Sequence, residues 1–578
     1  MPKAQYGSDV VVDMMQRFGI EYASLNPGSS FRGLHDSIVN YGSNNPQIIT
    51  CQHEEIAVQI AHGYARVTGK PMVAIVHNVV GLLHSCMAIY YASLDRVPVI
   101  VGGATGPMDT ARRRPHIDWN HTALVQGNAV RDYVRWDDQP YSIEAIPDSF
   151  ARGYRIASTH PQGPVYLCWD AALQEDPVTG PIPTIDPTRA QPPAPMMGDP
   201  EALEKAADML VKAEMPVILT EYTGRSQAGF TALVDLAEAL GAPVIDWHGR
   251  QNFPNTHPLS VFGSDVLRKA DVVLALDLSD LAAPLTELDR VTRRTVPIPP
   301  AGCKVIDIGF RDMRATGWSQ EFQKFYEVDL FMNADTSTTL PALTRLVQQR
   351  VLNDKTEAER VWKRSRDIHA IHDEVRAKWE KAAKKDWDAS PIGLARLSMD
   401  MRDALQGEDW VLCANPMRDT VHQYWDLEKW GRHTGDDLGT ATQIGMNLGI
   451  ALAHKKSGKL VTAIQTDGDL MFDAGALWIA THDQIPILLV MFNNRAYYND
   501  WEHQIRMAEV RERDVRMAYL GQEIDNPPPD FATVAKGFGW YSEGPIDQPK
   551  DVGPAIKRGI AKVKAGQPAL IDVVTQFR

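Results

Sequence analysis

Two short polar segments in the last third of the chain contain the residue types that hold a divalent cation beside a phosphate. The first is Thr466–Leu470 (TDGDL) and the second is Asn493–Asn494. A carboxylate and an amide oxygen suit Mg²⁺, which is usually held by few protein ligands together with phosphate oxygens. Turn amides and a following helix N-terminus suit the phosphate itself. These residue types therefore predict a metal and phosphate site.

The apolar runs beside these segments predict how they are brought together. Residues 460–464 (LVTAI) and 487–492 (ILLVMF) are continuous apolar runs, as is typical of parallel strands buried on both faces. A helical pattern from 473 to 481 separates them, and a right-handed crossover places the second strand beside the first. Asp467 and Asn494 would then lie at neighbouring strand ends, where open α/β sheets bind ligands. An ordinary βαβ unit with two polar strand ends is the structural alternative.

A second candidate site is a pair of carboxylates near the N-terminus of the chain. Residues 51–56 (CQHEEI) begin a helical pattern that continues to Thr68 and stops at Gly69. Acidic residues in a first helical turn are stabilised by the helix dipole. Glu54 and Glu55 therefore have a structural explanation as well as a catalytic one.

Two histidines belong to a third candidate region, after the apolar run 73–76 (VAIV). His77 stands at the end of this predicted strand and His84 follows seven positions later. Histidine titrates near neutral pH and is suited to moving protons. A lone histidine is more often structural, so the strand-end position is what favours an active-site role.

Two further segments are rich in polar side chains but have equally good structural explanations. Ser29 or Ser30 follows a Pro-Gly turn and could cap a helix. Residues 112–121 (RRRPHIDWNH) contain three consecutive arginines, which fit a solvated face or a subunit contact as well as an anion site.

The overall composition is that of a large globular protein. The residues are 44% hydrophobic, as in globular proteins. A chain of 578 residues is too long for one core and predicts about two to four domains. The net charge of −14 and the pI near 5.7 argue against nucleic acid or an anionic membrane as a partner. Five scattered cysteines without CxxC spacing predict reduced thiols. We see no signal region and no run of roughly eighteen apolar residues, so we expect a cytoplasmic protein.

A proline followed by a short apolar run recurs along the chain and predicts the fold class. Examples are 71–76 (PMVAIV), 216–219 (PVIL) and 568–571 (PALI), and most such runs follow amphipathic helical stretches. Alternation of helices with buried strands predicts an α/β protein with parallel sheets.

Two changes in composition divide the chain. Residues 179–200 are proline-rich and predict a stiff linker, and residues 353–388 are charged and predict a solvated helix between domains. We therefore expect three α/β domains, at 1–180, 195–350 and 390–578.

Together, the two carboxylate sites resemble those of the thiamine-diphosphate (ThDP) enzymes. The family has Gly-Asp-Gly followed by Asn-Asn; here Thr466 replaces the first glycine, and Asp467 and Asn494 are 27 positions apart (494 − 467 = 27). The helix containing 61–66 (AHGYAR) resembles the catalytic-glutamate helix of acetolactate synthase and benzoylformate decarboxylase. Counting back from this segment selects Glu54 as the catalytic carboxylate.

The substrate-side loops resemble narrower branches of the same superfamily. The loop with His77 is similar to that of benzoylformate decarboxylase, and also to a loop of cyclohexane-1,2-dione hydrolase. Residues 26–29 (NPGS) resemble benzoylformate decarboxylase too, in which a serine at the place of Ser29 contacts substrate. Residues 112–121 depart from the acetolactate synthase pattern, and no role is carried over to them.

The resemblance implies three doubly wound parallel-sheet domains: pyrimidine-binding, central and diphosphate-binding. It implies ThDP and Mg²⁺, bound between the first domain of one subunit and the third domain of another, and therefore a homodimer or homotetramer. In some relatives the central domain binds FAD or an ADP moiety; FAD is possible here, but no Gly-x-Gly-x-x-Gly segment supports it.

The resemblance also implies the roles of individual residues. Those assigned to catalysis are Glu54, His77, His84 and Ser29. Ala496 would add a backbone carbonyl to the metal ligands Asp467 and Asn494. The cofactor ligands are these three residues with Glu54, Gly468, Asp469, His422 and Leu438. His422 belongs to a His-Gln-Tyr-Trp segment, and Leu438 would be the apolar wedge under ThDP. The segment around Leu438 aligns in more than one register.

The implied function is cleavage of a C–C bond next to a carbonyl, through a ylide and an enamine of ThDP. The substrate would be a 2-oxo acid or a 1,2-dicarbonyl, and the reaction decarboxylation or C–C cleavage. The alternatives are an acetolactate-synthase-like carboligase and a flavin-containing dione hydrolase. A non-catalytic regulatory homologue is disfavoured because Glu54, Asp467 and Asn494 are all present.

Overall fold

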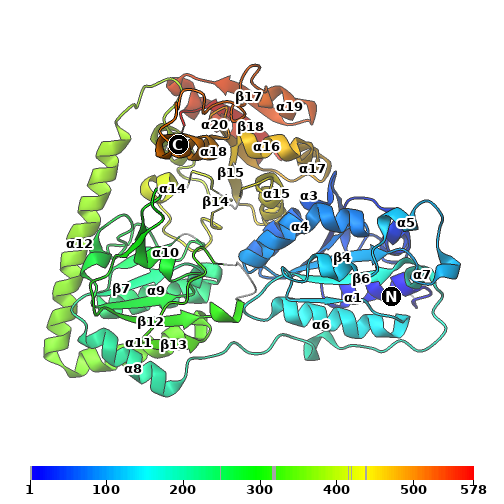
Figure 1. Ribbon diagram of the computed structural model, residues 1–578, viewed down its shortest axis with the longest axis horizontal. Coiled ribbons are helices and arrows are strands. Elements are labelled where there is room, and N and C mark those ends of the chain that lie inside the picture. Colours follow the sequence, from blue (N-terminus) through cyan, green and yellow to red (C-terminus); the bar gives the residue numbers. More distant parts are fainter. Residues whose placement is uncertain are drawn as a thin grey trace.

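Three parallel α/β sheets, each flanked by helices, form the corners of a triangle (Figure 1). This arrangement confirms the predicted fold class. The sheets take their strands from residues 22–170, 216–333 and 410–574, and the domain limits given above stay predictions. The computed structural model describes residues 3–247, 249–314, 320–413, 415–417, 419–436 and 439–577.

The first sheet has six strands in the order β2-β1-β3-β4-β6-β5, all of them parallel. Apolar side chains on its two faces pack under different helices. Helices α1 and α6 cover one face and α3 and α4 cover the other. These elements are β1 (Tyr22–Leu25), β2 (Gln47–Thr50), β3 (Met72–Ile75), β4 (Val99–Thr105), β5 (Trp136–Asp138), β6 (Val165–Asp170), α1 (Gly7–Arg17), α3 (Glu54–Thr68), α4 (Val79–Leu94) and α6 (Ile146–Ser158).

The middle sheet has five parallel strands in the order β13-β12-β9-β7-β8. Its central strands are fully buried under α8, α9 and α11. The elements are β7 (Pro216–Thr220), β8 (Val244–Asp246), β9 (Val272–Leu276), β12 (Lys304–Gly309), β13 (Leu330–Asn333), α8 (Pro200–Lys212), α9 (Gln227–Leu240) and α11 (Thr336–Asn353). A small antiparallel hairpin, β10 (Thr286–Leu288) with β11 (Thr295–Pro297), lies beside it.

The third sheet also has five parallel strands, in the order β14-β15-β16-β18-β17. Strands β15 and β16 are the two apolar runs singled out in the sequence, and they pair in parallel as expected. The strands are β14 (Trp410–Leu412), β15 (Leu460–Thr466), β16 (Leu488–Asn493), β17 (Tyr541–Ile546) and β18 (Ala569–Val574). The helices around it are α13 (Leu394–Ala404), α14 (Asp419–Tyr424), α15 (Gln443–His454), α16 (Asp467–Asp473), α17 (Leu477–His482), α18 (Tyr498–Val510), α19 (Phe531–Gly537) and α20 (Pro549–Lys564).

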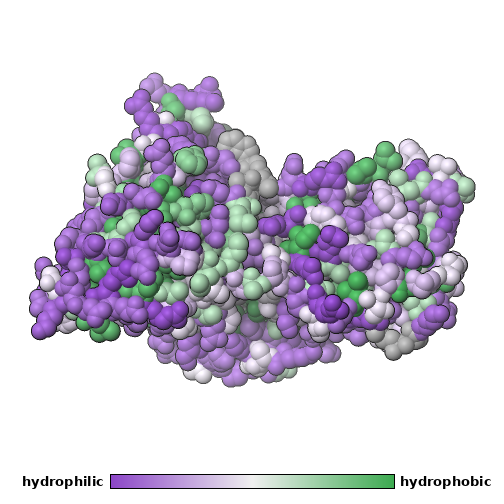
Figure 2. All heavy atoms as spheres, turned by 90° about the horizontal axis from the view of Figure 1, so that it is seen from below, coloured by the Kyte–Doolittle hydropathy of each residue, from purple (hydrophilic) through white to green (hydrophobic). Residues whose placement is uncertain are grey.

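Two connections join the three sheets. The proline-rich segment has one short 3₁₀ turn, Pro187–Arg189, and runs along the lower edge in Figure 1 from the first sheet to α8. The charged segment forms α12 (Lys355–Ala383), which spans from the middle sheet to the third. Most of α12 is exposed, which confirms the predicted solvated helix. Figure 2 shows the molecule from below, where the surface is mostly hydrophilic with apolar side chains in small groups.

The first and third sheets meet through helices α3 and α15. A Cβ added at Gly63 would lie 2.1 Å from the carbonyl oxygen of Met446, and one added at Gly449 would lie 2.2 Å from that of Ile60. The two helices therefore pack backbone against backbone, at a distance that only glycine permits. This contact fixes the N-terminus of α3 relative to the turn after β15.

Candidate active site

The turn between β15 and α16 buries two carboxylates. Asp467 is the first residue of α16 and is 2% exposed, and Asp469 is 7% exposed. The Asp469 carboxylate accepts hydrogen bonds from the backbone N–H groups of Ala441 (2.8 Å) and Gln443 (3.1 Å). Asp469 thus holds the loop before α15, while Asp467 faces the end of β16.

The oxygens of Asp467 and Asn494 converge on one backbone group. The N–H of Ala496 donates to Asp467 Oδ2 (3.2 Å) and to Asn494 Oδ1 (3.0 Å). Burial raises the pKa of Asp467 to about 7, although hydrogen bonds from backbone N–H groups favour the ionised form. A carboxylate and an amide oxygen side by side at strand ends fit a hard divalent cation, which would restore the ionised form of Asp467.

Thr466 occupies the position at which the sequence motif has its first glycine. Its backbone N–H (3.0 Å) and its hydroxyl (3.1 Å) both donate to Gln443 Oε1. The side chain of Thr466 is therefore held against the start of α15, and threonine at this position adds a second hydrogen bond between the end of β15 and Gln443.

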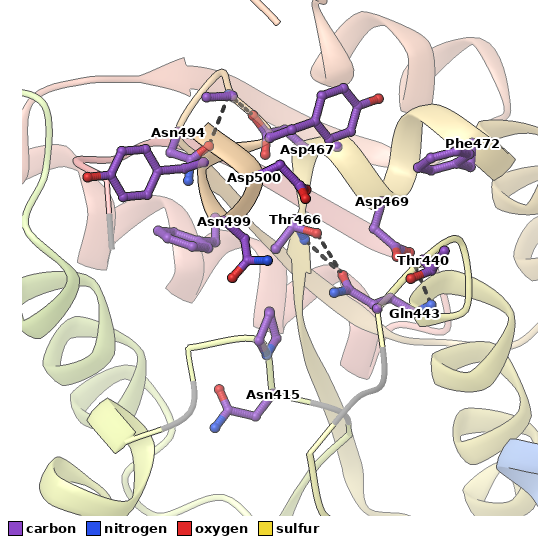
Figure 3. Close-up of a pocket in the computed structure, with 17 residues that line it drawn as sticks. Asn415, Thr440, Gln443, Thr466, Asp467, Asp469, Phe472, Asn494, Asn499 and Asp500 are labelled. Atoms are coloured by element: carbon purple, nitrogen blue, oxygen red, sulfur yellow. Dashed lines mark hydrogen bonds between the residues drawn. The ribbon is translucent and has the colours of Figure 1, made fainter. Parts of the chain in front are cut away.

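A cavity of about 350 Å³ opens beside these residues (Figure 3). Its walls include the polar side chains of the turn after β15, the residues after β16 and the aromatic rings of Phe472, Tyr497 and Tyr498. Gly468, Asn494 and Ala496 line it as well. All of its lining residues lie between Asn415 and Asp500, so this cavity belongs wholly to the third α/β unit.

Glu54 lies apart from this cavity, at the N-terminus of α3. His53 caps the helix by accepting a hydrogen bond from the N–H of Glu55 (3.3 Å). Glu54 is 4% exposed, and its Oε2 lies 3.1 Å from Nδ1 of His84. The His84 ring is 48% exposed and stacks on His53 at 4.8 Å. A Cβ on Gly81 would lie 2.7 Å from Glu54 Oε1, so α4 approaches the carboxylate this closely only because that residue is glycine.

The neighbouring Glu55 has a different environment. Burial, together with the charges of Asp473 and Asp469, raises the pKa of Glu55 to about 7. Glu55 therefore faces the third α/β unit of its own chain, whereas Glu54 faces α4. The choice of Glu54 as the catalytic carboxylate stays a prediction, and its contact with His84 supports it.

His77 is oriented by Ser30 rather than by Ser29. The Ser30 hydroxyl accepts a hydrogen bond from the N–H of Asn78 (3.2 Å) and lies 2.7 Å from His77 Nδ1. A serine hydroxyl can accept two hydrogen bonds as well as donate one, so the contact with Nδ1 fits either tautomer of His77. Burial lowers the pKa of His77, which favours the neutral imidazole. Ser29, to which the resemblance assigns a substrate contact, is exposed. Ser30, which the sequence indicated only as a possible helix cap, is the serine that contacts His77.

His422 and Leu438 are the two remaining predicted cofactor ligands. His422, in α14, is buried beside His433, with ring centroids 5.6 Å apart, and does not line the cavity. Leu438 lies outside the described residues. Asp469, Gly468 and Ala496 do line the cavity, as the motif predicted.

The polar side chains at the ends of the middle strands bond to one another. Arg225 pairs with Asp277 (2.5 Å) and Asp335 (2.9 Å), and the Glu221 carboxylate accepts from the backbone and hydroxyl of Ser279 (2.5 and 2.9 Å). Arg225 thus has two carboxylate partners, so this group of side chains carries no net positive charge.

The first, middle and last parts of the chain match the N-terminal TPP-binding, central and C-terminal TPP-binding domains of thiamine pyrophosphate enzymes, over residues 5–123, 203–343 and 417–573. The chain belongs to the thiamine pyrophosphate enzyme family. Both cofactor-binding domains are present, so its cofactor is thiamine diphosphate, the same compound. None of the helices in the described part of the chain is long and apolar enough to cross a membrane.

Several members of the family are similar to this chain over nearly its whole length. A probable acetolactate synthase large subunit from Methanocaldococcus jannaschii is 24% identical, over 98% of this chain and 91% of the relative. The probable 2-ketoarginine decarboxylase AruI of Pseudomonas aeruginosa is also 24% identical, over 94% and 90%. The structure of benzoylformate decarboxylase from Polynucleobacter necessarius superposes with a TM-score of 0.76 at 17% identity, over 99% of both chains. This thiamine pyrophosphate enzyme is thus of the decarboxylase and acetolactate synthase type.

Proposed function

We propose that the protein is a Mg²⁺-dependent ThDP lyase that cleaves a C–C bond of a 2-oxo acid or a 1,2-dicarbonyl. The observation that carries the proposal is the group of Glu54 at the start of α3, His84 in α4 and His77 just after β3. A buried carboxylate in contact with one imidazole, near a second imidazole held by a serine hydroxyl, is suited to moving protons and to orienting a carbonyl. Membership of the family identifies the cofactor as ThDP, and these three side chains favour C–C bond cleavage as the reaction.

In this proposal the third α/β unit holds the cofactor. Asp467 and Asn494 would bind Mg²⁺ through their side-chain oxygens and Ala496 through its carbonyl, and the turn after β15 would face the diphosphate. When bound, ThDP supplies the nucleophilic carbon and the electron sink for C–C cleavage.

The first α/β unit would handle protons and substrate. Glu54 would hold a proton at the aminopyrimidine nitrogen of the cofactor. His84, half exposed and bonded to Glu54, would exchange that proton with solvent. Ser30 holds Nδ1 of His77, so Nε2 would be the ring nitrogen that faces the substrate carbonyl oxygen. Two large apolar side chains near the two half-sites are exposed: Leu83, next to His84 in α4, is 56% exposed, and Phe472, at the cavity, is 59% exposed.

These two half-sites lie on one chain, but among the described residues none from the first α/β unit lines the cavity. We therefore propose a homodimer or homotetramer in which one subunit covers the cavity of another and buries the apolar side chains near it. A mixing experiment tests this assembly. Glu54→Gln and Asp467→Asn chains are each expected to be inactive, but refolded together they should recover about a quarter of wild-type activity, since half the dimers would hold one intact site. No recovery would place both halves of a site on the same chain.

The reaction is tested with a panel of 2-oxo acids and cyclic diones, with products identified by mass spectrometry. We expect turnover that needs both ThDP and Mg²⁺ and that falls at least about 100-fold in Glu54→Gln, because a general acid–base group contributes about 10²–10⁴-fold. Glu55→Gln is the matched control and should keep most of the activity. Equal losses in the two variants would refute the assignment of Glu54.

Two alternatives are separated by the same panel. A carboligase of the acetolactate synthase type would join two substrate molecules, and its product would be heavier than either. A flavin-containing dione hydrolase would purify with the absorption spectrum of a bound flavin. A single cleavage product and no flavin spectrum are expected.

A further inference from the structure

The three consecutive arginines after β4 are placed in different environments. Arg112 is exposed and forms two hydrogen bonds with the surface residue Asp176 (2.8 and 2.6 Å). Arg113 is exposed as well, and its Nε donates to the carbonyl of Pro107 (3.1 Å). Arg114 alone turns inward, with a side chain that is 21% exposed. The sequence left a solvated face or a subunit contact and an anion site as alternatives, and Arg112 is exposed and already paired with Asp176.

The guanidinium of Arg114 is held rigidly. Asp118, which is 1% exposed, accepts hydrogen bonds from the Arg114 backbone N–H (2.5 Å) and from Nη2 (3.1 Å). Nη1 donates to the carbonyl of Ser29 (3.3 Å). A guanidinium has five N–H donors, so several stay available. Nε is buried and has no hydrogen-bond partner among the described residues.

Arg114 lies near the imidazoles of the substrate side. The ring of His121 meets that of His77 edge to face, with centroids 5.3 Å apart. Nδ1 of His121 is buried and has no hydrogen-bond partner in the described part of the chain. After burial, the charges of His121 and Arg114 contribute to lowering the pKa of His77, while Glu54 opposes them. His121, Arg114 and Glu54 are therefore each within electrostatic reach of His77.

We propose that Arg114, with His121 beside it, binds an acidic group that the substrate keeps through the reaction. The substrate would then be a 2-oxo acid or 1,2-dicarbonyl that carries a second carboxylate or a similar acid. This inference rests on the function proposed above and narrows its substrate class.

A retained acid is favoured over the carboxylate that leaves. A departing carboxylate loses its charge as neutral CO₂ forms, so an arginine bound to it would stabilise the reactant more than the transition state. A retained acid keeps its charge throughout, and a guanidinium binds it with short, charge-assisted hydrogen bonds. The pair with Asp118 fixes the direction of these donors.

The test compares 2-oxopentanoate with 2-oxopentanedioate, which differ by one terminal carboxylate, on the full-length protein with ThDP and Mg²⁺. We expect the wild type to prefer the dianion. Arg114→Gln should lower kcat/KM for the dianion about 10- to 100-fold, mainly through KM, and for the monoanion less than about threefold. His121→Asn should cause a smaller loss in the same direction. Arg112→Gln, the neighbour on the surface, should leave both substrates unchanged.

A binding measurement accompanies the kinetics. Pentanedioate should raise the melting temperature of the wild type more than pentanoate does, and this difference should vanish in Arg114→Gln. Equal effects of Arg114→Gln on both substrates, or no difference between the two acids in melting temperature, would overturn the proposal. Failure of the proposed function looks different: ThDP and Mg²⁺ would not stabilise the protein, and no 2-oxo acid or dione would react.

Discussion

A buried ion network where the three α/β units meet allows a quantitative test of the structure. Asp95, at the C-terminus of α4, is 4% exposed and lies 2.7 Å from Nε2 of His62. Its carboxylate also lies 3.3 Å from Arg66 Nε and 3.4 Å from Arg250 Nη2. Burial opposes its ionisation, but the charges of Arg250 and Arg66 and the bond from His62 outweigh burial and hold the pKa of Asp95 well below its usual range.

Replacement of Asp95 by Asn removes the counter-charge and leaves two buried guanidinium groups. Breaking a buried pair in this way costs about 3–5 kcal/mol. The two arginines also donate to the loop that leads to the cofactor cavity, Arg66 to the carbonyl of Asp436 (3.1 Å) and Arg250 to that of Thr434 (3.0 Å). We therefore expect Asp95→Asn to lower the midpoint of thermal unfolding by about 6–20 °C, taking about 2–4 °C per kcal/mol for a unit of this size. ThDP should bind more weakly too.

The measurement is differential scanning calorimetry of the cofactor-free protein, repeated with ThDP and Mg²⁺. Asp176→Asn is the matched control: it breaks an equally short pair with Arg112 that is exposed on both sides, and should cost less than about 1 kcal/mol. If Asp95→Asn were as mild as this control, the buried network would not be stabilising. The pH dependence adds a check. A carboxylate whose pKa is lowered in the folded state stabilises the fold at pH values above its unfolded pKa near 3.9, and this stabilisation is lost as the pH falls further. The difference between wild type and Asp95→Asn should persist from pH 8 to 5 and shrink below pH 4.

Two further predictions concern the other buried carboxylates. Asp467→Asn should abolish the stabilisation by ThDP and Mg²⁺, which is about 2.7 kcal/mol at 100 times Kd. It should also raise the melting temperature of the cofactor-free protein at pH 8, where the wild type must bury an ionised group. If ThDP and Mg²⁺ shifted the melting temperature of the variant as much as that of the wild type, Asp467 would not be a metal ligand. The raised pKa of Glu55, about 7, means that the wild type loses stability as pH rises from 4.5 to 7. Glu55→Gln should show no such loss in cofactor-free melting curves, and parallel curves for the two proteins would contradict the assignment.

The fold was predictable because it depends on local pattern. Apolar runs after prolines marked the strands, and the crossover rule placed Asp467 and Asn494 on neighbouring strand ends before any coordinates. The end of α3 at Gly69 followed from the helix stop signal, and Gly69 has the left-handed φ of +66° that this stop requires.

The contacts of the site were less predictable, because they depend on which way adjacent side chains turn. Ser29 and Ser30 are neighbours in one 3₁₀ turn, and the turn geometry alone decides that Ser30 contacts His77. The inward turn of Arg114 depends on Asp118, four residues later, and the outward turn of Arg112 depends on Asp176 from a distant segment. His422 was assigned from a short similarity, whereas its position depends on how α14 packs in the complete third unit.

In the proposed site, substrate choice and cofactor binding draw on different parts of this chain, and their structural support differs accordingly. The cofactor side is built on strand ends and held by backbone groups: Asp467 and Asn494 both accept from the N–H of Ala496. The substrate side depends on side chain-to-side chain contacts, such as those of His84 with Glu54 and of Arg114 with Asp118. The N–H of Ala496 stays in place when a nearby side chain is changed, whereas a single substitution can remove one whole partner of a side-chain pair. Changes around Arg114 should therefore alter which carbonyl compound is accepted while leaving ThDP affinity intact.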